Sequence, residues 1–378
     1  MKYMKHASFF VVGFLTVCLG SALSGPVPAP VLHRYLYVAT PDGAQADSGS
    51  GVGMMVFDLD KDFALVRRIE VPSMSEGVRG LTGCMATRAL YFSTTSRRLG
   101  AFDLKSEKVL WNRQYEAGCD RSSITADGRT LYAPTGWWIK GDDDGLLVID
   151  AATGENQRRI KLGKTAHNSL ISADGKRLFL GTQTTLHELD PADGRVLQSI
   201  PDVGETGVFP FTVDAARHYA YVCLGAHVGF DVVDLQQGKA VHRVLAGEAP
   251  IAHRTHGAAL TPDEQEVWIS DQDGKRLYIF NNTVMPPTAA GHVELSMGGH
   301  GWVNFSMDGK FAWSHTPDIF DVKTRKKVAT LRDEKGTPVG GSKLIEVHFF
   351  DGQVVAVGSE FGLGRKGLPQ PVRKVDGK

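Results

Sequence analysis

The chain has 378 residues, and its 42 lysines and arginines are balanced by 42 aspartates and glutamates, so its formal net charge at pH 7 is zero. A balanced chain has no overall field to attract nucleic acid or an anionic membrane surface, so we expect neither as a partner. The 43 glycines, the 17 prolines and many short runs of Val, Ile, Tyr and Phe favour an all-β fold rich in turns.

The N-terminus has the pattern of a secretory signal peptide. A basic start precedes an apolar run over residues 7–23, and small residues stand before Gly25. We therefore predict a signal peptide over residues 1–24, an exposed leader over 25–32, and a periplasmic or extracellular mature protein without a membrane span. A retained anchor and lipidation at Cys18 are the alternatives.

Cleavage would leave three cysteines, Cys84, Cys119 and Cys223. An odd number allows at most one intramolecular disulfide, even in a compartment that permits disulfides. Stability must therefore come from a large packed core rather than from a disulfide framework.

A turn with Asp, usually followed by Gly and then by an apolar run, recurs along the chain. Its copies lie at Asp127, Asp174, Asp214, Asp263, Asp308 and Asp351, and successive aspartates are 47, 40, 49, 45 and 43 residues apart. A period of about 45 residues suits one four-stranded propeller blade. We predict a seven-bladed β-propeller of four-stranded antiparallel blades over residues 33–363, followed by a flexible tail over 364–378.

The first and last segments are expected to share one blade. Residues 35–38, 54–57 and 68–71 supply its outer strands, and residues 344–349 return as its inner strand. This arrangement closes the ring and removes exposed strand edges. Residues 354–358 then form a surplus strand, and an incomplete eighth blade is the alternative.

Three runs carry a resemblance to a known family. Tyr35-Leu-Tyr-Val-Ala-Thr, Thr130-Leu-Tyr-Ala-Pro-Thr and Arg177-Leu-Phe-Leu-Gly-Thr resemble the repeats of YVTN-repeat, YncE-like propellers. The resemblance spans nearly the whole mature chain. It implies a periplasmic or extracellular seven-bladed propeller, related in fold to the large subunits of quinoprotein amine dehydrogenases. Such a motif says little about activity.

Candidate site residues come from the start of each inner strand, which faces the axial mouth of a propeller. Counting seven residues back from each aspartate gives Asp120, His167, Gly207, His256, Gly301 and Leu344. Counting eight back adds His300, and His253 lies three residues before His256. Arg79 aligns with this mouth through the second blade. The mouth is therefore predicted to be rich in histidine.

The loops between second and third strands open on the same face and add His227 and His315. Neutral imidazoles from several blades can hold a transition metal, and copper or iron suits imidazole without thiolates. We take as metal candidates His167, His253, His256 and His300. We take as candidates for binding a small ligand Arg79, Asp120, His227 and His315, and Arg79 could pair with a carboxylate or phosphate. A wet channel that binds nothing specific is the third possibility.

The sequence contains no nucleophile elbow, phosphate loop or dinucleotide fingerprint. The leading hypothesis is therefore a monomeric, non-enzymatic propeller that binds a small ligand or a periplasmic protein partner at its mouth. The alternative is a copper- or iron-dependent oxidoreductase or lyase. A docking scaffold that uses Trp137 and Trp138 is the third hypothesis, and the acidic loop at 142–144 is expected to be a solvated hairpin tip.

Overall fold

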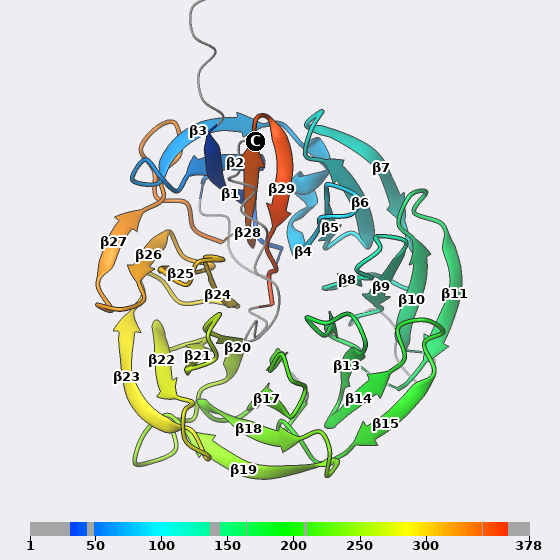
Figure 1. Ribbon diagram of the computed structural model, residues 1–378, viewed down its shortest axis with the longest axis vertical. Helices are drawn as coiled ribbons and strands as arrows, with labels where there is room; N and C mark the ends of the chain where they lie inside the picture. Colours follow the sequence, from blue (N-terminus) through cyan, green and yellow to red (C-terminus); the bar gives the residue numbers. More distant parts are fainter. Residues whose placement is uncertain are drawn as a thin grey trace, which may run out of the picture. The chain divides into compact units, whose positions relative to one another are not determined.

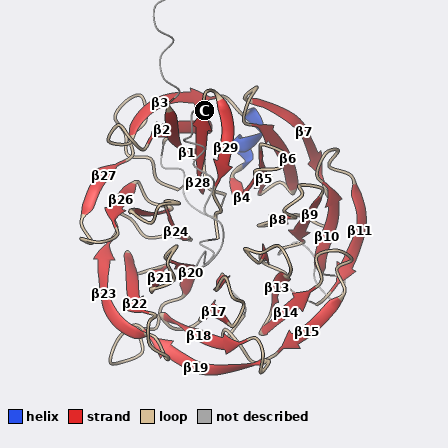
Figure 2. Ribbon diagram, in the orientation of Figure 1, coloured by secondary structure: helices blue, strands red, loops and turns tan. Residues whose placement is uncertain are grey.

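Short strands follow one another throughout the part of the chain that the computed structural model describes, which is residues 31–43, 49–136, 144–163, 165–207, 210–341 and 343–361. From Leu32 onward they belong to one unit (Figure 1). β-branched and aromatic residues fill these runs, and such side chains fit a pleated, half-buried surface. A short 3₁₀ turn, η1 (Pro72–Glu76), interrupts the strands before the second blade (Figure 2).

Seven antiparallel sheets form the blades of a β-propeller, as predicted. Blades 2 to 7 each take four consecutive strands. Blade 2 comprises β4 (Val78–Cys84), β5 (Ala89–Thr94), β6 (Arg98–Asp103) and β7 (Lys108–Gln114). Blade 3 comprises β8 (Ser123–Ile124), β9 (Thr130–Pro134), β10 (Gly145–Asp150) and β11 (Asn156–Lys161). Blade 4 comprises β12 (Ser169–Ile171), β13 (Leu178–Thr182), β14 (Thr185–Leu189) and β15 (Val196–Ile200). Blade 5 comprises β16 (Phe211–Val213), β17 (Tyr219–Cys223), β18 (Gly229–Asp234) and β19 (Lys239–Leu245). Blade 6 comprises β20 (Thr255–Leu260), β21 (Glu266–Asp271), β22 (Arg276–Asn281) and β23 (Thr288–Glu294). Blade 7 comprises β24 (Val303–Phe305), β25 (Phe311–Ser314), β26 (Asp318–Asp321) and β27 (Lys327–Thr330).

Blade 1 joins the two ends of the described chain. Its strands lie in the order β29 (Gln353–Val357), β28 (Lys343–Phe350), β1 (Leu32–Thr40), β2 (Gly53–Asp58) and β3 (Ala64–Ile69). The predicted return of the C-terminal segment as the inner strand is therefore confirmed. The surplus run forms a fifth strand, because β29 pairs with the far end of β28, and the described residues form no eighth sheet.

Apolar side chains of neighbouring blades pack together between the sheets. One cluster joins blades 1 and 2 through side chains that include Tyr37, Ile345 and Phe92. Another joins blades 7 and 1 through Trp313 and Leu36. Blade 1 is therefore packed on both faces, as closure of the ring requires. The outermost strand of each blade, in contrast, consists mostly of exposed or half-buried residues.

The Asp turns share one hydrogen-bond pattern. In four of them a Ser or Thr hydroxyl donates to the carboxylate two residues later, at Thr125–Asp127, Ser172–Asp174, Thr261–Asp263 and Ser306–Asp308. In the first of these turns Gly128 has φ 73°, a conformation that glycine adopts at no steric cost. The recurring Asp turn is therefore stabilised locally, by the hydrogen bond between the hydroxyl and the carboxylate.

Blade 5 departs from the repeat as we aligned it. Val213 pairs with Ala220 as Ile124 pairs with Leu131, so Asp214 stands two residues earlier in its turn than Asp127. Asp214 accepts hydrogen bonds from the backbone N of His218 and Tyr219. It therefore takes the place of the hydroxyl residue rather than that of the repeat aspartate.

Several predictions fall outside the described residues: the signal peptide, most of the leader, Trp137 and Trp138, most of the acidic loop, and the tail. Cys84, Cys119 and Cys223 are buried and free, so no disulfide joins them. No helix within the described ranges is long and apolar enough to cross a bilayer.

Ring closure can be tested at Ile345, whose side chain is fully buried in the cluster between blades 1 and 2. We expect Ile345→Ala to lower the free energy of unfolding by about 2–5 kcal/mol, because the substitution leaves a cavity at the closing strand. Urea unfolding measures this loss. Val328→Ala, at a residue 51% exposed, is the control, and a loss no larger than that of the control would show that closure depends on other contacts.

Candidate functional site

The inner strands of several blades bring polar residues to the axis. Arg79 lies in β4, Asp120 and His167 precede β8 and β12, and His256 lies in β20. The strand registers show that these four residues occupy one repeat position. The same registers show that Gly207 and Leu344 do not occupy this position, so our assignments of these two residues were wrong.

Three of the predicted histidines lie together. The ring centres of His167 and His256 are 5.6 Å apart, and those of His256 and His300 are 4.9 Å apart, both in edge-to-face contact. His167 and His256 are each 3% exposed, and His300 is half-buried. The count along the repeat therefore selected side chains that meet across the axis.

Burial keeps these imidazoles neutral at pH 7. It lowers the pKa of His167 to about 4, against the opposing effect of Asp120. Burial, followed by the nearby cation of Arg121, holds the pKa of His256 well below its usual range, and burial also lowers that of His300. Neutral imidazoles can accept or donate a hydrogen bond, and they can ligate a metal.

Arg79 and Asp120 form an ion pair beside these rings. Arg79 Nη2 donates to Asp120 Oδ2 at 2.9 Å, and the Asp120 side chain is fully buried. Burial would raise the pKa of Asp120, but Arg79, with smaller contributions from His167 and Arg121, lowers it. The pair therefore stays ionised. The negative charge of Asp120 also raises the pKa of His167, against the larger effect of burial.

His315 lies in the loop between β25 and β26, next to Gly301 and close to His300. Its side chain is 1% exposed. Burial lowers its pKa to about 4, while Asp42 opposes this shift. Lys343 Nζ donates to Asp42 Oδ2 at 2.6 Å in the same region. His315 therefore stands beside a second buried ion pair.

Arg121 is the central residue that the sequence reasoning missed. Its guanidinium affects the pKa values of Asp120, His167, His256 and His300, so it lies among all of them. Its side chain is 3% exposed, and its Nε is buried without a hydrogen-bond partner among the described residues. The nearest carboxylate oxygen is Glu360 Oε1, at 4.0 Å from Nε.

An aromatic ring supports this guanidinium. Arg121 Cζ lies 4.5 Å from the centre of the Trp302 ring, which is a cation–π distance. The strand registers put Arg121, Trp302 and Lys343 at one repeat position, directly after the position that we had counted. A count of six residues instead of seven back from the aspartates would have found the first two.

His227 and His253 pair with acidic residues of their own surroundings instead. His227 Nδ1 lies 2.8 Å from Glu205 Oε1, and His253 Nδ1 lies 3.2 Å from Asp271 Oδ1. Their side chains are 36% and 41% exposed. None of the contacts found for them in the described chain reaches the axial histidines.

The metal candidates do not form a ready ligand set as they stand. Among the described residues, no three His, Cys, Asp or Glu side chains are arranged to hold a metal ion. The three axial rings therefore contact one another in pairs without pointing three donor atoms at one centre.

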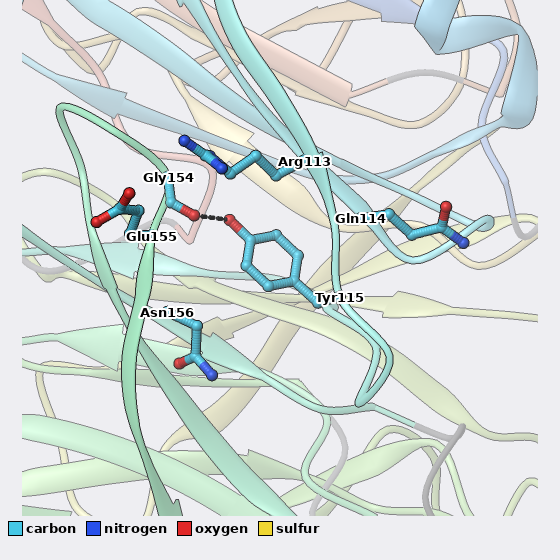
Figure 3. A pocket seen from close by; sticks show the side chains of 6 residues that line it. All are labelled: Arg113, Gln114, Tyr115, Gly154, Glu155 and Asn156. Atoms are coloured by element: carbon cyan, nitrogen blue, oxygen red, sulfur yellow. Dashed lines mark hydrogen bonds between the residues drawn. The ribbon is translucent and has the colours of Figure 1, made fainter.

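A polar groove at the outer edge of blades 2 and 3 is a less suitable candidate. Figure 3 shows its lining residues, with the Tyr115 hydroxyl donating to the Gly154 carbonyl at 2.6 Å. Its charged side chains, Arg113 and Glu155, are exposed to water. Water screens such charges, so they bind ions weakly compared with the buried groups at the axis.

No protein-family model matches the sequence, and no curated protein matches it. Among solved structures, a chain of hydrazine synthase from Kuenenia stuttgartiensis is similar, with a TM-score of 0.55 and 17% identity over 66% of this chain and 77% of that chain. In all, 1672 solved chains match, so the likeness supports a widely used β-propeller fold and carries no activity with it.

The buried axial histidines predict a pH dependence of stability. His315 has a pKa of about 4 when folded and an ordinary value of 6.5. Between these values only the unfolded chain takes up the proton, so stability is full above pH 6.5 and falls by about 1.4 kcal/mol per pH unit towards pH 4. Urea unfolding across this range should show a shallower slope for His315→Gln, by about one proton. His292→Gln, at an exposed site, is the control, and equal slopes for His315→Gln and the wild type would contradict the prediction.

Proposed function

We propose that the protein is a secreted, YncE-like propeller without enzymatic activity, which binds a small anionic ligand at its axial mouth. Arg121 is the residue that carries this proposal. Its Nε–H is buried without a hydrogen bond to any described residue, and leaving a charged donor buried and unpaired is costly. A ligand that supplies acceptor atoms would remove this cost.

The arrangement of charges at the axis supports an anion. Arg79 is neutralised by Asp120, and Lys343 is neutralised by Asp42. Arg121 instead has Glu360 Oε1 at 4.0 Å from its Nε, which is beyond hydrogen-bond distance. Of these three cations, Arg121 is therefore the one without a hydrogen bond to a carboxylate of the described residues, and an anionic ligand can supply one.

The chemistry of Arg121 favours a carboxylate over other anions of this size. The planar fork of a guanidinium matches the two oxygens of a carboxylate, which gives two parallel charge-assisted hydrogen bonds. The neutral imidazoles of His167, His256 and His300 add polar groups that carry no opposing charge. Localisation and family are supported by the N-terminal pattern and by the repeat motifs of the sequence.

We expect small carboxylates to stabilise the wild-type protein and to lose this effect in Arg121→Gln. A ligand at about 100 times its Kd raises the free energy of unfolding by about 2.7 kcal/mol. Thermal unfolding with acetate, benzoate and inorganic phosphate at constant ionic strength measures the effect. Arg195→Gln, at an exposed arginine, is the matched control. A wild type that none of these anions stabilises, or an Arg121→Gln variant that responds equally, would contradict the proposal.

A metal centre is the second candidate, and the ring contacts of His167, His256 and His300 favour it. Two imidazoles on one ion place their ring centres roughly 5 Å apart, since the metal–nitrogen bond is about 2.0–2.1 Å long. The observed 5.6 and 4.9 Å fit this spacing. Small side-chain rotations would be needed to aim the nitrogens at one point. Copper or iron bound there would be the basis of an oxidoreductase or lyase.

Metal analysis after dialysis separates this candidate from the first. If the centre exists, protein incubated with copper, iron, zinc or manganese ions retains about one equivalent, and the double variant His256→Ala/His300→Ala retains none. The double variant His227→Ala/His253→Ala is the control, because these histidines lie apart from the axial rings. Wild-type protein that stays metal-free after all four incubations would exclude the centre.

A further inference from the structure

The chain beyond β29 enters the axial site. We call residues Gly358–Phe361 the axial strap, and Figure 1 shows this red end of the described chain running from β29 towards the middle of the ring. The backbone N of Gly358 donates to the Glu346 carbonyl at 2.8 Å, and Asn304 Nδ2 donates to the Ser359 carbonyl. The strap is therefore attached to blades 1 and 7.

Glu360 brings a carboxylate to Arg121 without pairing with it fully. Oε2 accepts a hydrogen bond from the backbone N of Leu81 at 2.7 Å, which fixes the side chain against blade 2. Oε1 lies 4.0 Å from Arg121 Nε, and neither of these two atoms has a hydrogen-bond partner. Both side chains are at most 4% exposed. This contact is longer than a charge-assisted hydrogen bond, which measures about 2.7–2.9 Å.

Phe361 brings an aromatic ring to Trp302. The two ring centres are 5.3 Å apart with an interplanar angle of 74°, which is an edge-to-face contact. Trp302 is also the residue whose ring lies against the Arg121 guanidinium. The strap therefore presents a carboxylate to Arg121 and an aromatic ring to the neighbouring indole.

The strap leaves almost no free space at this point of the axis. A small cavity remains between Trp302, Trp313, His315, Lys343 and Glu360, and it has room for about one water molecule. Nε1 of Trp302 and Nε1 of Trp313 are buried without a hydrogen-bond partner in the described part of the chain. The site is therefore filled by the chain itself, while some of its donors stay unused.

We propose that the axial strap occupies the ligand position, and that the ligand which displaces it is an arylalkanoate, a carboxylate carried next to an aromatic ring. This inference rests on the proposed function of Arg121. An external carboxylate can make the two hydrogen bonds to the guanidinium that Glu360 does not make. Its ring can take the place of the Phe361 ring on Trp302. The strap then competes with the ligand and lowers its apparent affinity.

The test compares strap variants by titration calorimetry with 3-phenylpropanoate. Glu360→Gln removes the competing charge and Phe361→Leu removes the competing ring, so each should bind the probe about tenfold more tightly than the wild type. Glu334→Gln, at an exposed carboxylate that pairs with Arg68, is the matched control and should bind as the wild type does. 3-Cyclohexylpropanoate and 3-phenylpropanamide should bind more weakly than 3-phenylpropanoate to every variant.

Each outcome bears on a different part of the proposal. Unchanged affinity in both strap variants would overturn the role of the strap, while a response lost in Arg121→Gln would leave the proposed function in place. Equal binding of the three probes would overturn the ligand class. Binding of no carboxylate to the wild type or to the variants would overturn the proposed function as well. If Glu360→Gln does not fold, as circular dichroism will show, the affinity of Phe361→Leu decides the role of the strap.

Discussion

The pairing of β1 with β28 is the interaction on which the rest of the structure depends. Leu32–Ala39 pair with Lys343–Phe350 in one continuous antiparallel register. A propeller blade cannot bury both of its faces without two neighbours, so the seven blades are stable together only when this pairing closes the ring. Closure also creates the axis. The inner strands converge there, and the same β28 that closes the ring brings Lys343 to the site. The strand that follows it, β29, leads the chain into the axial strap.

Convergence has an electrostatic cost, because it buries charged groups from several blades. Two of the three buried cations at the axis are paired with carboxylates, Arg79 with Asp120 and Lys343 with Asp42. Removing one partner of such a pair would leave an uncompensated buried charge, which typically costs about 3–5 kcal/mol. Arg121 is different, because the carboxylate oxygen that lies nearest to it among the described residues, Glu360 Oε1 at 4.0 Å, is too far away for a hydrogen bond. A fold that needed these charges for stability alone would gain more from apolar side chains. The incomplete pairing of Arg121 is therefore the observation on which the proposed ligand binding rests.

The sequence was sufficient for the fold because the Asp turn recurs with a local cause, the hydroxyl–carboxylate hydrogen bond that Thr125 and Asp127 exemplify. It was also sufficient for the axial histidines, because equivalent positions of repeated blades meet at one axis. The repeat alignment failed in blade 5, because Asp214 occupies the position of the hydroxyl residue of the turn. The count back from Asp214 is therefore shifted by two residues. It could not find the role of Glu360, because that residue lies outside the repeat. Its position follows from the unexpected pairing of β29 with β28.

The residues that break the symmetry of the repeat are those that define the site. At the position of Arg121 the other described blades carry glycine, asparagine, proline, tryptophan or lysine, so repetition fixes the place of this residue but not its chemistry. Glycines at this position allow close packing of the neighbouring blades. A side chain at Gly80 would meet Arg121, and a side chain at Gly257 would meet the backbone of Gly301 and Trp302. Trp302 therefore packs close to blade 6 and turns its ring towards Arg121 and Phe361. The proposed recognition of a carboxylate next to an aromatic ring thus depends on one cation and one indole, held at equivalent positions of blades 3 and 7 by a ring of repeated blades with different side chains at those positions.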